Sequence, residues 1–201
     1  VKNGWEMVLL AAAILRKDSF LNLSGSEEFS KNYELNCSIE LQKWDWTAPQ
    51  LQCALDTVRR EAINHNAKLW LASYKAFPFV VERLKQLESE NIDFGVLTTK
   101  NAEFTSHLLK DLNLYPKLLH GHESGSKAKV LSEIAKTESV TGFIEDRLTT
   151  LKTITNTAGL DSIRCYLAQW GYLKPCDQKN LPPTIHLLDK KLFMSPLANW
   201  H

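Results

Sequence analysis

The sequence predicts an α/β protein, a doubly wound and mostly parallel sheet with an α-helical module ahead of it. Over about residues 5–70, apolar positions recur every three or four residues and no alternating strand pattern is present. From residue 78 onward, short apolar runs alternate with helical segments, as in βαβ units. Hydrophobic residues make up 44% and charged residues 23%, which is typical of a folded globular chain. We therefore expect a helical module over residues 1–72 and an α/β module over residues 73–201.

The helical module is expected to contain three helices, over residues 5–15, 27–44 and 48–71. The second is predicted to open at Ser24-Gly25-Ser26-Glu27, because a capping serine followed by early acids suits a helix N-terminus. Thr47 is the expected N-cap of the third helix, and the proline two residues later is tolerated in a first turn. The module is therefore predicted from caps and helical periodicity together.

The α/β module is expected to alternate short strands with helices. Strands are predicted at residues 92–97, 140–144, 162–168 and 184–188, with a further short apolar piece at 117–120. Helices are predicted at residues 78–90, 102–112, 127–137 and up to about 157. Because such strands are joined by crossover helices, we expect the sheet to be parallel, with helices on both faces.

Composition and the absence of certain motifs exclude several classes of protein. The formal net charge is +1, which gives no electrostatic case for a nucleic acid or an anionic membrane as partner. The apolar run at residues 7–15 is about half the length needed to cross a bilayer. The four cysteines have no metal-binding spacing and suit reduced thiols in the cytoplasm. Neither GxGxxG nor GxxxxGK[ST] occurs, which argues against a dinucleotide or P-loop site.

Polar residues follow two of the predicted strands. Thr98 and Thr99 follow the strand at 92–97, and Glu145 and Asp146 follow the strand at 140–144. In an open parallel sheet, ligands bind outside the carboxyl ends of the strands. Two adjacent carboxylates there could ligate Mg²⁺, although Asp146 could instead serve only as the N-cap of the next helix.

Lys127 opens the helix that follows the Gly/Ser-rich segment HGHESGSK. A lysine in the first turn opposes the positive end of the helix dipole, and a nearby anion would relieve that conflict. The alternatives are that Lys127 extends into solvent, or that Lys129 is the relevant lysine. The hydroxyls of Thr98 and Thr99 could be structural, yet the backbone N–H groups there suit a phosphate. Together these residues predict a phosphate and Mg²⁺ site.

At this point the sequence resembles the haloacid dehalogenase-like (HAD) hydrolase superfamily. FGVLTTK resembles the family's second motif, with Thr98 in the key place, and GSKAKVL resembles the third, with Lys127. GFIEDR resembles the fourth, a strand that ends in paired acids. The helical module is similar to the family's helical cap, and YKAFPFVVERLKQL is similar to the usual return into the core. The likeness covers nearly the whole chain, and GWEM, FIEDRLTTL and YLAQWGY are most similar to a branch found in cyanobacteria and plants.

The resemblance implies a Mg²⁺-dependent phosphohydrolase that cleaves a small phosphorylated substrate through an aspartyl-phosphate. Thr98 would hydrogen-bond the phosphoryl oxygens, with Thr99 beside it. Lys127 would neutralise the phosphoryl group and position the nucleophile. Asp146, with Glu145 directly or through water, would hold Mg²⁺. The expected location is the cytoplasm, or the plastid in a plant.

The family's first motif, a strand ending in DxD that provides the nucleophile, has no counterpart in these residues. Asp45 is the nearest imitation, but no apolar strand precedes it. We expect the motif in a segment upstream of Val1. In the family this strand is also the middle of the sheet, so its absence would leave a hole in the core. The alternatives are a non-catalytic protein that binds or regulates with the same fold, and an inactive truncated fragment.

Overall fold

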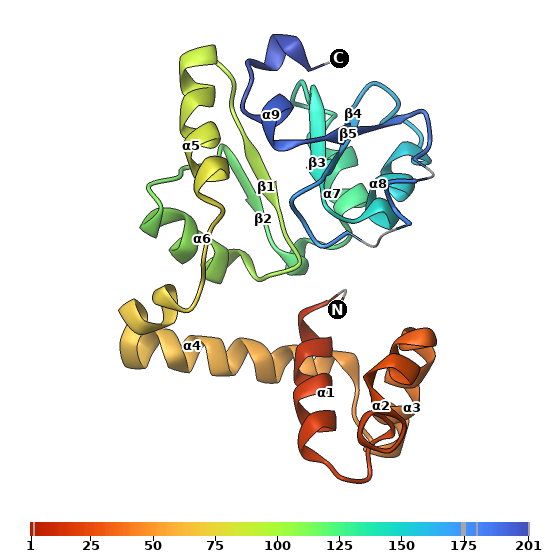
Figure 1. Ribbon diagram of the computed structural model, residues 1–201. Helices are drawn as coiled ribbons and strands as arrows, with labels where there is room; N and C mark the ends of the chain where they lie inside the picture. Colours follow the sequence, from red (N-terminus) through yellow and green to blue (C-terminus); the bar gives the residue numbers. More distant parts are fainter. Residues whose placement is uncertain (2, 174–175, 180, 201) are drawn as a thin grey trace. The chain divides into compact units, whose positions relative to one another are not determined.

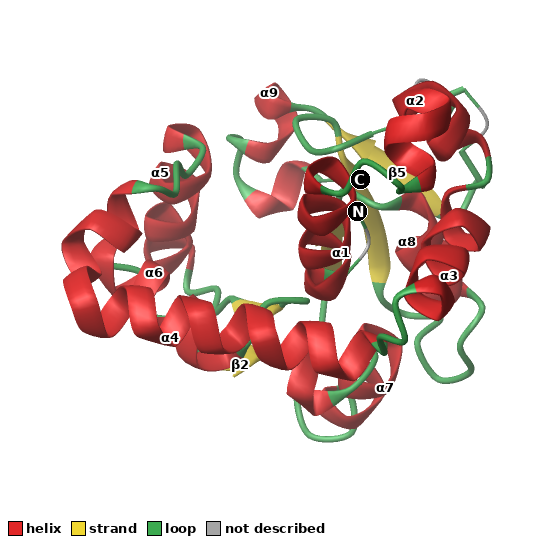
Figure 2. Ribbon diagram, turned by 90° about the horizontal axis from the view of Figure 1, so that it is seen from below, coloured by secondary structure: helices red, strands yellow, loops and turns green. Residues whose placement is uncertain are grey.

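The computed structural model describes residues 1, 3–173, 176–179 and 181–200. The chain is a mixed α/β protein with two compact units. The first unit comprises Val1–Tyr74 and Thr99–Phe104, and the second comprises Lys75–Thr98 and Thr105–His201. In Figure 2 the strands lie in the second unit, while the first consists of helices and loops. None of the described helices combines the length and the apolar character that crossing a bilayer requires.

Four helices build most of the first unit (Figure 1): α1 (Gly4–Leu15), α2 (Phe20–Lys31), α3 (Tyr33–Lys43) and α4 (Ala48–Ala72). Thr47 caps α4 as predicted, since its hydroxyl accepts from the Gln50 amide and the Gln50 side chain accepts from the Thr47 amide. An apolar core joins α1 to the other three helices: Leu9, Ala13, Phe29, Cys37, Trp44 and Leu51.

The single helix expected over residues 27–44 is wrong, because two helices occupy this stretch. The first, α2, begins seven residues earlier, where the Ser19 hydroxyl accepts from the Asn22 amide at 3.1 Å. Gly25 then kinks α2 with a φ of 82°, a left-handed value that glycine adopts without a side-chain clash. Asn32 separates α2 from α3 with φ and ψ of −123° and 49°. Helical geometry resumes after Gly25, within the segment Ser24–Glu27 where the sequence predicts a helix start.

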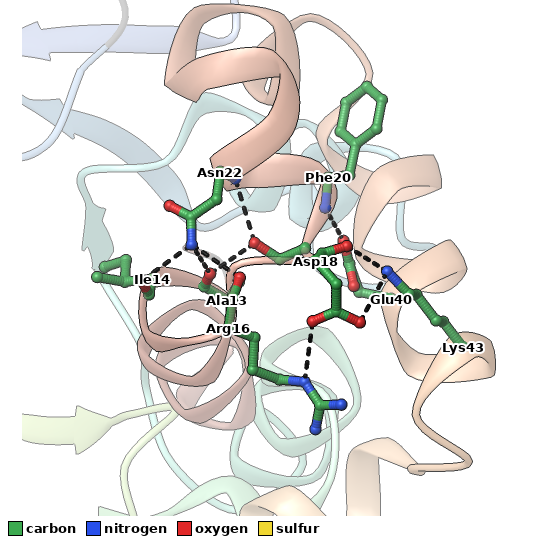
Figure 3. Close-up of polar contacts among 9 residues, drawn as sticks. Ala13, Ile14, Arg16, Asp18, Phe20, Asn22, Glu40 and Lys43 are labelled. Carbon is green, nitrogen blue, oxygen red and sulfur yellow. Dashed lines mark hydrogen bonds and ion pairs between the residues drawn. The ribbon is translucent and has the colours of Figure 1, made fainter.

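The turn between α1 and α2 is held by polar side chains (Figure 3). The Asn22 amide nitrogen donates to the carbonyls of Ala13, Ile14 and Arg16 at 2.8–3.0 Å. The buried Ser19 hydroxyl also donates to the Ala13 carbonyl, at 2.6 Å. Because the last carbonyls of a helix have no partner within the helix, these bonds complete the C-terminus of α1.

The second unit contains the strands, which are parallel as predicted. Its elements are α5 (Pro78–Gln86), η1 (Leu87–Glu90), β1 (Gly95–Leu97), α6 (Ala102–Asp111), β2 (Leu118–His120), η2 (His122–Ser124), α7 (Lys127–Ile134), β3 (Gly142–Glu145), α8 (Leu148–Thr155), β4 (Arg164–Ala168), β5 (Ile185–Leu188), α9 (Lys190–Phe193) and η3 (Leu197–Asn199). The first three residues of α6 belong to the first unit. The main core of the second unit gathers apolar residues of α7, α8, β4, β5 and the segment between α8 and β4: Leu131, Leu148, Leu151, Ile154, Leu160, Ile163, Cys165, Leu167 and Ile185.

The strands form two sheets rather than one. The first sheet pairs β1 with β2, and the second has the order β3-β4-β5. Among the described residues, β1 and β3 each pair along one side only. Four of the five residues of β4 are buried, whereas Ile144 of β3 is 40% exposed. Within the described residues, β3 is therefore an edge strand of its sheet, while β4 is the central and best covered strand.

A buried arginine joins α5 to the C-terminal segment. Arg83 is 1% exposed and pairs with Glu90 through two hydrogen bonds, at 2.5 and 3.1 Å. Its Nε donates to the Phe193 carbonyl at 2.9 Å, and the Leu197 amide donates to Glu90 at 2.8 Å. Segments more than 100 residues apart in the sequence thus share one ion pair.

Candidate functional site

Three predicted site residues meet at the carboxyl end of β3. Glu145 is the last residue of β3, Asp146 follows it, and Lys127 is the first residue of α7. The Lys127 Nζ lies 2.5 Å from the Glu145 Oε2. The Glu145 side chain is 6% exposed and that of Lys127 is 23% exposed. A charge-assisted contact this short, at a largely buried site, fixes the ammonium beside the paired acids.

The backbone ahead of α7 sets the position of Lys127. Gly125 adopts a φ of 103°, which suits glycine, and the Ser126 hydroxyl then caps α7 by accepting from the Lys129 amide at 3.3 Å. Lys127 therefore occupies the first turn, as predicted. The Lys129 side chain is exposed, so the ion pair distinguishes Lys127 from its alternative.

Asp146 does not serve as the N-cap of the next helix, the alternative that its sequence position allows. The N-cap residue of α8 is Arg147. The Asp146 Oδ2 instead accepts from the Tyr172 amide at 3.1 Å, while its own amide donates to the Glu145 Oε1 at 3.0 Å. The Asp146 carboxylate is thus held by the loop after β4.

The two carboxylates have pKa values that shift in opposite directions. Burial raises the pKa of Glu145, the hydrogen bond with Asp146 adds to this rise, and the charge of Lys127 opposes it. Burial also acts to raise the pKa of Asp146, but hydrogen bonds with Glu145 and the Tyr172 amide, and the charge of Lys127, lower it overall. Asp146 therefore loses its proton at a lower pH than Glu145 does, beside the positive charge of Lys127.

Gly171 and Tyr172 belong to this site, although no motif pointed to them. A Cβ at position 171 would lie 2.1 Å from the Asp146 Cβ and 2.7 Å from its Oδ2, so the backbone of the loop touches the acid directly. The sequence feature that could have identified Gly171 is the glycine in QWGY, which follows an apolar strand. A glycine in such a place often marks a close approach of the backbone to another group.

We expect Gly171→Ala to destabilise the protein by about 1–3 kcal/mol, because the methyl group must displace Asp146 or the loop. Urea denaturation would measure the change in the free energy of unfolding. Gly95→Ala is the matched control, since its nearest neighbour is 3.5 Å away, an ordinary van der Waals contact. Equal stability of the two variants would contradict the close approach.

The predicted threonines lie in other elements. Thr98 follows β1, where its amide donates to the His120 carbonyl at 2.9 Å, and it is half-buried. Thr99 is exposed and falls in the first unit. Their joint action with Lys127 and the acids stays a prediction.

The acid pair meets the minimum that Mg²⁺ requires from a protein. Mg²⁺ is usually held by one or two carboxylates and completes its six ligands with water and phosphate oxygens. Asp146 and Glu145 could supply such oxygens, and the lowered pKa of Asp146 keeps that carboxylate charged. No group of three or more His, Cys, Asp or Glu side chains with metal-binding geometry occurs in the described part of the chain.

No family model, curated protein or solved structure matches this chain. A function can therefore be inferred only from the residues themselves and from their geometry at the end of β3.

Proposed function

We propose that the intact protein is a Mg²⁺-dependent phosphohydrolase of the HAD-like class, acting on a small phosphate monoester. The observation that carries the proposal is the ion pair of Lys127 with Glu145 beside Asp146. An ammonium paired with the first of two adjacent acids, next to a strand end, suits the binding of a phosphoryl group together with a divalent cation.

In the proposed reaction, an aspartate oxygen attacks phosphorus, the new O–P bond forms as the ester O–P bond breaks, and the leaving alcohol takes up a proton. Water then hydrolyses the aspartyl-phosphate and releases inorganic phosphate. Lys127 would offset the charge of the phosphoryl oxygens, Thr98 would donate its hydroxyl to them, and Asp146 with Glu145 would hold the cation. Mg²⁺, when bound, supplies further positive charge toward the phosphoryl oxygens.

The nucleophile belongs to a segment preceding Val1 in this proposal. The sides of β1 and β3 that are unpaired in the described part of the chain support it, because a parallel strand lying between them would join the two sheets. Such a strand would end near the carboxyl end of β3, where Asp146 begins the next loop.

The test is phosphate release from p-nitrophenyl phosphate by the full native chain, with Mg²⁺ and with EDTA. We expect Mg²⁺-dependent release, and a loss of about 100-fold in kcat/KM for Lys127→Met, because one preorganised charge is removed. Lys129→Met, two residues away and exposed, should stay within about twofold of wild type.

Mg²⁺ binding without turnover by the native chain would contradict the enzyme and favour the non-catalytic binding protein. Turnover that is equal in Lys127→Met and Lys129→Met would contradict the assignment of this site.

A further inference from the structure

Tyr172 is the most exposed of the bulky hydrophobic residues that the structure describes, with 92% of its surface accessible. Its ring and hydroxyl make no hydrogen bond or ring contact with another residue in the described part of the chain. Single exposed aromatic residues are ordinary on protein surfaces, so the place of Tyr172 in the fold decides its meaning.

The backbone of Tyr172 lies against the candidate site. Its amide donates to the Asp146 Oδ2 at 3.1 Å, which places the Tyr172 Cα within about 5 Å of that oxygen. Gly171, the residue before it, has no side chain, and a Cβ there would clash with Asp146. The exposed ring is therefore attached to backbone that touches one of the two acids.

The loop that carries Tyr172 is anchored on both sides. The Trp170 ring packs against the rings of Phe79 and Phe193, with centroids 5.3 and 4.7 Å apart. On the other side, Leu173 packs against the main core of the second unit. Because both neighbours and the Tyr172 amide are held, the backbone has a fixed position at this residue, and only the ring extends into solvent.

A ring fixed in this way can contribute binding energy without a large loss of conformational entropy. A tyrosine has only two side-chain torsions, so it offers much contact area at a low entropic cost. Its face packs best against another flat aromatic group, in an offset or edge-to-face arrangement. An uncharged ring also adds no repulsion toward a phosphate. The ring therefore favours a ligand that combines a phosphate with an aromatic group.

We propose that Tyr172 contacts the organic part of the substrate and selects phosphate monoesters that carry an aromatic group. This proposal rests on the proposed phosphohydrolase function, since it assigns the substrate class of the same site. The closeness of the Tyr172 backbone to Asp146 favours a short link between the aromatic group and the phosphate.

Calorimetric binding of two phosphonates to the full native chain with Mg²⁺ tests the proposal without turnover. The probes are benzylphosphonate and cyclohexylmethylphosphonate, which have the same charge and the same number of carbon atoms. They differ in that one ring is flat and aromatic and the other is puckered and saturated. We expect benzylphosphonate to bind about fivefold more tightly, the effect of one aromatic pair.

Tyr172→Ala should reduce this preference to less than about twofold, whereas Tyr172→Phe should keep it, because the packing needs the ring and not the hydroxyl. Tyr115→Ala is the matched control and should also keep the preference. Tyr115 is 72% exposed and lies between α6 and β2, away from the residues of the candidate site in the sequence. Because the Tyr172 ring is exposed, its removal should leave the urea midpoint of unfolding unchanged.

Turnover provides a second measurement with benzyl phosphate and cyclohexylmethyl phosphate as substrates. Tyr172→Ala should raise KM for benzyl phosphate about fivefold and leave kcat within about twofold, since the lost contact binds the organic part of the ester. KM for cyclohexylmethyl phosphate should change by less than about twofold.

Equal affinity for the two phosphonates, failure of both to bind, or a preference that survives Tyr172→Ala would overturn the proposal. Failure of the phosphohydrolase function has a different signature. The wild-type chain would then release no phosphate from p-nitrophenyl phosphate with Mg²⁺, while the Tyr172-dependent difference between the phosphonates would stay in place.

Discussion

Asp146→Asn should lower the Mg²⁺-dependent phosphate release of the full native chain by about 1,000-fold. The substitution is nearly isosteric and removes the charge that Glu145, the Tyr172 amide and Lys127 maintain on this side chain against its burial. An amide also offers Mg²⁺ a weaker oxygen ligand than a carboxylate does. The loss should therefore appear in kcat and in the Mg²⁺ concentration needed for half-maximal rate.

The control for this prediction is Asp111→Asn, an exposed acid near the end of α6. Asp111→Asn should leave kcat and the Mg²⁺ concentration needed for half-maximal rate within about twofold of wild type. Calorimetric measurement of Mg²⁺ binding separates the role of the acid from a folding defect. A folded Asp146→Asn protein should bind the ion at least tenfold more weakly than wild type does. Unchanged turnover and unchanged Mg²⁺ affinity in the Asp146→Asn protein would contradict the site assignment.

Arg83→Met should destabilise the protein by about 3 kcal/mol, because it leaves the Glu90 carboxylate and the Phe193 carbonyl without their buried partner. The methionine keeps much of the volume of the aliphatic stem, so the effect measures lost polar contacts more than a cavity. Chemical denaturation gives the change in the free energy of unfolding. Lys85→Met, on the same helix and exposed, should change it by less than about 0.5 kcal/mol.

The contribution of the Arg83–Glu90 ion pair to the free energy of unfolding should also depend on pH, which provides a second measurement. Arg83, and then the Leu197 amide, lower the pKa of Glu90 below its ordinary value of 4.5. A carboxyl whose folded pKa is lowered contributes stability that is present above its unfolded pKa and is lost as the pH falls through the folded value. The difference between wild type and Arg83→Met should therefore shrink below pH 4.5. A constant difference down to pH 2 would contradict the role of the ion pair.

Local patterns predicted most elements of the fold, since caps and periodicity are properties of neighbouring residues. Thr47 marked the start of α4, and the apolar runs marked the parallel strands to within a few residues. The break between α2 and α3 was missed because helical periodicity continues across Asn32, while the start of α2 depends on Ser19, whose hydroxyl donates to the preceding helix. Arg83 was missed because its partner Phe193 lies 110 residues away.

The position of Glu145 and Asp146 at the end of a strand was predictable, because it follows from the apolar run that precedes them. The pairing of Lys127 with Glu145 needed the fold, because it joins a helix to a strand 18 residues later. Gly171 could not be assigned from sequence, since its role depends on how closely the loop after β4 approaches Asp146. The split into two sheets was not foreseen, since the sequence predicted a single parallel sheet.

The sides of β1 and β3 that no described strand pairs with carry backbone N–H and C=O groups, the groups through which a further strand adds to a sheet. On β3 these groups lie beside the partly exposed Ile144, and no charged or proline residue interrupts the strand before Glu145. Natural sheets blunt such edges to prevent aggregation. A segment or partner that covered this side of β3 would therefore also protect the chain against association through that edge.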